Sequence, residues 1–143
     1  MGTTTFSGPV KAGTIREGTG INTGFTLMAQ SAVIDIIGAT NTTAVGIIPA
    51  NSQIVDVILN VTTVANDSGT ATVKIGHTGD DDEYLAATNV KAVATTRGTI
   101  GADGTDIGTS DQTVNAIYTA ANADGTTGAA TVTVLYMQNN NLS

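Results

Sequence analysis

Residues 53–63 have the sequence QIVDVILNVTT, which is the strongest strand signal in this chain of 143 residues. Val55, Val57, Leu59 and Val61 stand at alternate positions, so an extended backbone would place them on one face of a sheet. The opposite face is mixed, because two isoleucines alternate there with polar residues. The pattern predicts a strand with one face in a hydrophobic core and the other face partly covered.

Further strand signals lie on both sides of this segment. Apolar or β-branched runs occupy residues 25–37, 44–48, 70–76, 91–96, 98–100, 113–120 and 129–137, whereas 84–90 suits either a helical turn or a weak strand. Two turn sequences, Asn66–Gly69 and Asp124-Gly125, are expected to close β-hairpins, and Asn41 and Thr42 to form a turn. About eight strands at this spacing predict an all-β fold, a β-sandwich or jelly roll.

Alternation within the later segments predicts which side chains form the core. The expected inward-facing sets are Ala71, Val73 and Ile75, then Val114, Ala116 and Tyr118, and finally Ala130, Val132, Val134 and Tyr136.

Composition restricts the possible functions. Charged residues make up 12% of the chain, and its net charge is −7 with an isoelectric point near 4.1. Such a chain gains nothing from displacing the counterions of DNA or RNA, so we exclude nucleic acid as the main partner. Because the chain has no cysteine, disulfides and thiol nucleophiles are also excluded.

The first 24 residues differ from the rest, being rich in glycine with widely spaced apolar residues and two basic ones. We predict an extended arm (1–24), a β-domain (25–138) and a polar tail (139–143); the alternative for 1–24 is a flexible terminus. The candidate contact residues of the arm are Phe6, Val10, Lys11, Ile15, Arg16 and Ile21. The chain lacks the pattern of a signal peptide and any apolar run of membrane-spanning length, so we expect synthesis in a cytosol and no membrane partner.

Little in the sequence indicates chemistry. His77 is the only histidine, and no Gly-x-Ser-x-Gly motif is present, so we expect no catalytic residue, no cofactor and a solvated loop histidine. Asp80, Asp81, Asp82 and Glu83 form the one dense carboxylate group and are weak candidates for a cation site. A solvated acidic loop is the favoured interpretation of these four residues.

Several segments resemble small virion proteins of tailed bacteriophages. They are Ile48–Val57, Val61–Thr63, Val73–Gly76, Glu83–Thr88 and Val132–Tyr136, within a resemblance that spans roughly residues 24–137. The resemblance implies a capsid decoration (cement) protein, commonly a homotrimer with a β-sandwich or jelly-roll fold on the head surface. It also implies the major capsid protein as partner and the virion as location, after synthesis in the cytoplasm of a bacterial host.

Two other functions stay open at this stage. The chain could be a head-fibre, tail or host-binding module, in which case the loops near Asp80 and Asp106 would hold the ligand site. A cation-dependent hydrolase is a remote alternative, disfavoured by the single histidine and the missing nucleophile motif.

Overall fold

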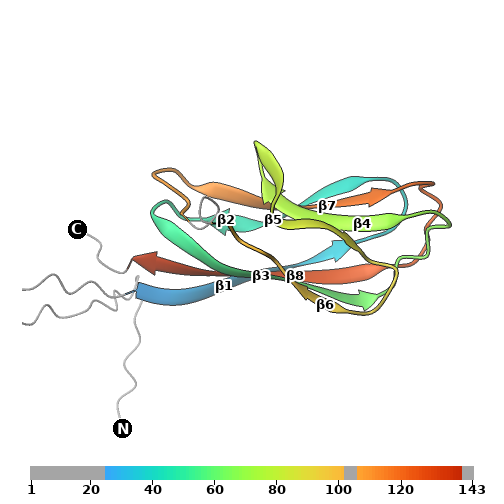
Figure 1. Ribbon diagram of the computed structural model, residues 1–143, viewed down its shortest axis with the longest axis horizontal. Coiled ribbons are helices and arrows are strands. Elements are labelled where there is room, and N and C mark those ends of the chain that lie inside the picture. The colour runs from blue at the N-terminus through green and yellow to red at the C-terminus, as the bar shows by residue number, and fades with distance from the viewer. Residues whose placement is uncertain (1–24, 102–105, 140–143) are drawn as a thin grey trace, which may run out of the picture.

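The computed structural model describes residues 25–101 and 106–139, which form two four-stranded antiparallel sheets packed face to face (Figure 1). The first sheet has the order β1-β8-β3-β6 and the second has the order β2-β7-β4-β5. The strands are β1 (Phe25–Asp35), β2 (Asn41–Ile48), β3 (Ser52–Thr63), β4 (Ala71–His77), β5 (Asp80–Asn89), β6 (Thr95–Arg97), β7 (Gln112–Ala120) and β8 (Ala129–Asn139).

The strand pairing is that of a jelly roll. The first strand pairs with the last, β2 with β7, β3 with β6, and β4 with β5, as in one long hairpin that has been rolled up. Each sheet therefore combines strands from both halves of the chain. The predicted all-β sandwich of about eight strands is confirmed.

The core lies between the two sheets and consists mainly of aliphatic side chains with three buried tyrosines. All ten side chains predicted to face inward on β4, β7 and β8 are buried. Alternation predicted these strands correctly because each has one face against the opposite sheet, so the period of two is set by burial.

The prediction for β3 is wrong at one position. The register against β8 shifts between Ile54 and Asp56, so Val55 is the extra residue of a β-bulge. Ile54 and Val57 are both buried, whereas Val55 is 48% exposed. The bulge reverses the alternation at this point, which a strict period of two does not anticipate.

The two predicted hairpins are also wrong, because their turns connect strands of different sheets. Asn66–Gly69 leads from β3 to β4, and Asp124-Gly125 leads from β7 to β8. The buried carboxylate of Asp67 instead joins the two turns, accepting hydrogen bonds from the backbone N–H groups of Gly69 (2.8 Å), Asn122 (3.4 Å) and Asp124 (3.2 Å). The polar residues that suggested two separate tight hairpins therefore form a pair of hydrogen-bonded turns at one end of the sandwich.

Smaller differences concern strand ends. Residues 84–90 belong mainly to strand β5, and Asn41 begins β2 rather than a turn, whereas only Thr95–Arg97 is a strand within residues 91–100. None of the described residues forms a helix long and apolar enough to cross a membrane.

Candidate functional site

The hairpin of β4 and β5 projects from the sandwich (Figure 1). The single histidine of the sequence and its four consecutive acidic residues lie near the tip of this hairpin. Thr78 and Gly79 form its two-residue turn, with Gly79 at a φ of 115° that other residues rarely adopt. A side chain at buried Gly76 would meet the backbone of Asp80 and Asp81, so glycine is required where β5 crosses it. The predicted acidic loop is therefore the beginning of a strand.

Three of the carboxylates are brought together at this tip. Asp80, Asp81 and Asp82 are all exposed, and each offers an oxygen within 4.8 Å of the others. Asp81 is ion-paired with Lys74 of β4, and the backbone N–H of Asp82 donates to Oδ1 of Asp80 at 3.4 Å. Because one carboxylate is already paired and all three face solvent, the group resembles a solvated acidic surface more than a cation cage.

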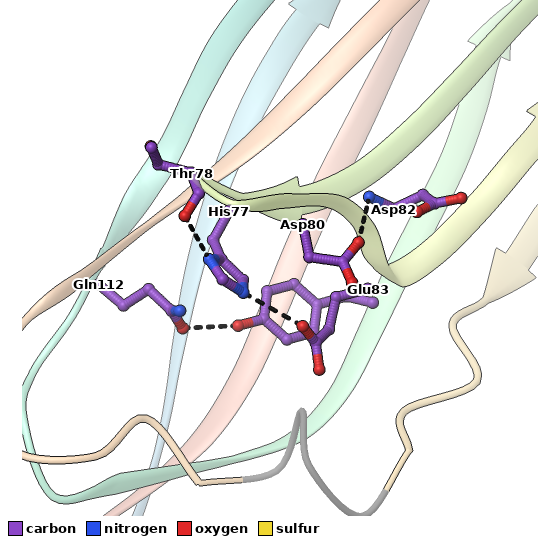
Figure 2. A network of polar contacts seen from close by, with 7 residues as sticks. His77, Thr78, Asp80, Asp82, Glu83 and Gln112 are labelled. Atoms are coloured by element: carbon purple, nitrogen blue, oxygen red, sulfur yellow. Dashed lines mark hydrogen bonds and ion pairs between the residues drawn. The ribbon is translucent and has the colours of Figure 1, made fainter.

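Glu83, the fourth acidic residue, faces away from that group and contacts His77. Figure 2 shows the imidazole between two acceptors: Nδ1 lies 2.9 Å from the carbonyl oxygen of Thr78, and Nε2 lies 3.1 Å from Oε2 of Glu83. The histidine is half-buried within β4, so the prediction of a solvated loop histidine is wrong. Each nitrogen thus has an acceptor beside it, so a neutral ring can donate to one of the two and a protonated ring to both, and the contact with Glu83 links β4 to β5.

Tyr84 continues this network into the interior. Its hydroxyl donates to Oε1 of Gln112 on β7 at 2.6 Å, and its ring centre lies 6.0 Å from that of His77. Burial, followed by the charges of Glu83 and Asp80, raises the pKa of Tyr84 to about 12. The phenol therefore keeps its proton at neutral pH and acts as a hydrogen-bond donor that joins β5 to β7.

A second candidate surface lies on the first sheet and was missed in the sequence. Leu27 and Val33 on the outer side of β1 are 60% and 71% exposed. Leu27 pairs with Met137 of β8 and Ala29 pairs with Leu135, and these β8 residues alternate with buried Val134 and Tyr136, so they face outward too. We call this set, Leu27, Ala29, Val33, Leu135 and Met137, the β1 surface.

A signal for the β1 surface was present in the sequence. The run FTLMAQSAVID has apolar residues at both odd and even positions, so one apolar group had to face outward in any strand. The six predicted arm contacts, Phe6, Val10, Lys11, Ile15, Arg16 and Ile21, lie outside the described residues.

The topology defines this chain as an eight-stranded jelly-roll protein, a fold found in viral capsids, lectins and cupins. Similar chains occur in two solved bacteriophage capsids. One belongs to the "Acidic stable capsid structure of Helicobacter pylori bacteriophage KHP30", with a TM-score of 0.63 and 17% sequence identity over 82% of this chain and 94% of that chain. Another belongs to the "Cyanophage Pam1 capsid asymmetric unit", with a TM-score of 0.61 and 17% identity over 89% of this chain and 94% of that one.

No protein-family model matches the sequence, and no curated protein matches it significantly. At 17% identity the likeness to the two capsid chains is one of fold, and it extends over most of this chain and over 94% of each capsid chain.

Proposed function

We propose that this chain is a structural protein of a bacteriophage particle, which binds the capsid surface and stabilises the shell as a cement protein. The observation that carries the proposal is the fold likeness to chains of two phage capsids, each covered over 94% of its own length. The virion resemblance of the strand and turn segments points in the same direction. The partner in this proposal is the major capsid protein, and the working form is a homotrimer.

The described site chemistry agrees with such a role. The polar groups at the β4–β5 tip are engaged with one another and join strands: His77 with Glu83, Tyr84 with Gln112, and Lys74 with Asp81. A cement protein needs a rigid body and contact surfaces, and it needs no activated side chain. Trimerisation would multiply weak contacts with the shell, because the second and third contacts form at high effective concentration.

The segment 1–24 provides contacts to the shell or to a neighbouring subunit in this proposal. Its spaced apolar residues, Phe6, Val10, Ile15 and Ile21, would anchor it, and Lys11 and Arg16 would meet acidic partner groups.

The test uses purified full-length protein and empty heads of the phage whose genome encodes it. We expect saturable binding by cosedimentation, extra density on the head surface by cryo-electron microscopy, and heads that withstand higher temperature. Deletion of residues 1–20 should abolish binding, while a control truncation of residues 140–143 at the other end should leave it unchanged. Heads that bind no full-length protein would overturn the proposal.

A host-binding module of the virion is the second candidate, favoured by the projecting tip with three exposed aspartates. Fluorescently labelled protein would then bind host cells, and replacing Asp80, Asp81 and Asp82 with asparagine would remove that binding. Binding to cells without binding to heads would favour this candidate over the cement protein.

A further inference from the structure

Strand β1 is an unusual edge strand. It has 11 residues and, among the strands that the structure describes, β8 is its one neighbour. Natural edge strands are normally protected from pairing by lysine, proline, a bulge or short length. No proline and no lysine occurs in β1, its pairing with β8 runs without a register shift, and its single charge is Asp35 at the last position.

The outward side of the same strand is apolar at Leu27, Ala29 and Val33, although Ser31 lies between Ala29 and Val33 and is hydrogen-bonded to Thr133 of β8. Leu27 and Val33 are more than half exposed, and Leu135 and Met137 of β8 extend the β1 surface beside Leu27. Interfaces between proteins are depleted in charge at their centre, as this surface is. An unguarded edge next to an apolar face is the arrangement that receives an added strand from another segment.

The position of the chain ends indicates which segment this is. Phe25, where the described residues begin, pairs with Asn139 at the start of β1, so residues 1–24 join the sheet next to the β1 surface. Twenty-four residues can span about 80 Å when extended, more than twice the length of about 35 Å expected for an 11-residue strand. The segment is therefore long enough to reach the β1 surface of an adjacent molecule.

Charge favours contact between residues 1–24 and the acidic body of a copy of this chain over exposure of the segment to solvent. Residues 1–24 contain Lys11, Arg16 and Glu17 and have a net charge of +1. Because the whole chain has a net charge of −7, residues 25–143 have a net charge of −8. Bodies of equal negative charge repel one another at short distance. A basic segment that lies between two of these bodies reduces their repulsion. If each subunit of a closed ring gives this segment to the next subunit, every segment and every β1 surface is occupied.

We propose that the β1 surface of one subunit binds residues 1–24 of a neighbouring copy of this chain, as an added strand along β1. This inference rests on the proposed function for the homotrimer and identifies what holds it together. The apolar residues of the segment would cover Leu27 and Val33, and its backbone would pair with the open edge of β1.

The first experiment compares two full-length variants by light scattering over a range of concentrations. Val33→Lys places a charge in the β1 surface, and Val93→Lys is its matched control, because Val93 is 70% exposed and lies between β5 and β6. We expect Val33→Lys to weaken association at least tenfold and Val93→Lys to leave it unchanged, with equal thermal midpoints for the two monomers. Equal association by both variants, or a wild-type chain that is monomeric, would overturn the inference.

The second experiment shows whose arm is bound. The full-length double variant Phe6→Asp/Ile15→Asp should associate at least tenfold more weakly than wild type, as Val33→Lys does. When the two defective variants are mixed, one still has a competent arm and the other a competent β1 surface, so association should reappear as mixed dimers by native mass spectrometry. Absence of mixed dimers would overturn the inference, because a competent arm and a competent β1 surface would then be present together without binding.

Failure of this inference and failure of the proposed function give different results. If the Phe6→Asp/Ile15→Asp variant remains trimeric but no longer binds heads, the arm contacts the shell and the cement function stands. If wild-type protein associates through arm and β1 surface but never binds heads, the exchange stands and the cement function fails.

Discussion

The side chain of Gln30 on β1 crosses to the opposite sheet, where its Nε2 donates a hydrogen bond to the carbonyl oxygen of Ile47 on β2 at 2.7 Å. The same nitrogen lies 3.2 Å from the hydroxyl of Tyr136 on β8. Gln30 therefore joins the two sheets at the side where β1 and β2 are both edge strands. Gly46 makes this possible, because a Cβ atom there would overlap the Gln30 side chain.

Replacing Gly46 with alanine should therefore destabilise the fold. The added methyl group would displace Gln30 and break its hydrogen bonds, with an expected cost of about 2 kcal/mol in the free energy of unfolding. Urea denaturation measures this cost. In a Gln30→Ala background the penalty should fall below about 1 kcal/mol. An equal penalty in both backgrounds would show that Gln30 is not the group in conflict.

The two most deeply buried tyrosines should respond differently to loss of the hydroxyl. Tyr84 donates to Gln112, whereas the hydroxyl of Tyr118 is buried without a hydrogen-bond partner among the described residues. Tyr84→Phe should cost about 1 kcal/mol, and Tyr118→Phe should be neutral or stabilising, because it removes a buried polar group that gains no bond. Denaturant titration of both variants tests the difference, and equal losses would contradict it.

Stability should decline in acid partly through Asp124. Hydrogen bonds from the side chain and backbone of Ser68 hold the pKa of Asp124 below its ordinary value of 3.8. A carboxyl whose pKa is lower in the folded state contributes stability above the unfolded value, and this contribution is lost as the pH falls through the folded value.

The measurement compares wild type and Ser68→Ala by urea denaturation from about pH 5 to pH 2. The variant should lose less stability over this range, because its carboxyl is held less strongly in the charged form. Ser68 also accepts a hydrogen bond from Asn122, whose loss shifts both ends of the curve equally. Parallel curves for the two proteins would contradict the assignment.

Calcium should have little effect on this protein. Asp80, Asp81 and Asp82 are exposed, and Asp81 is paired with Lys74, so millimolar Ca²⁺ should move the thermal midpoint by less than about 1 °C. A larger stabilisation that disappears in Asp81→Asn would establish a cation site at the tip. Magnesium at equal concentration controls for general screening of the acidic surface.

Sequence patterns were reliable for strands whose two faces differ in burial. The alternating sets of β4, β7 and β8 were all identified, because each strand has one face in the core. They were unreliable at Val55 and at the turns Asn66–Gly69 and Asp124-Gly125, because a bulge and a change of sheet depend on strands that are distant in the sequence. For the site, the sequence identified the acidic residues at 80–83 but not their contacts.

By itself, the sequence determined an all-β body, its acidic charge, most of its core and the absence of thiol chemistry, since these follow from composition and local alternation. The tertiary structure alone decided the jelly-roll order of the strands, the contact of His77 with Glu83 and the exposure of Leu27 and Val33. The physical reason is that alternation determines which side chains share a face, whereas pairing between distant strands determines what each face meets.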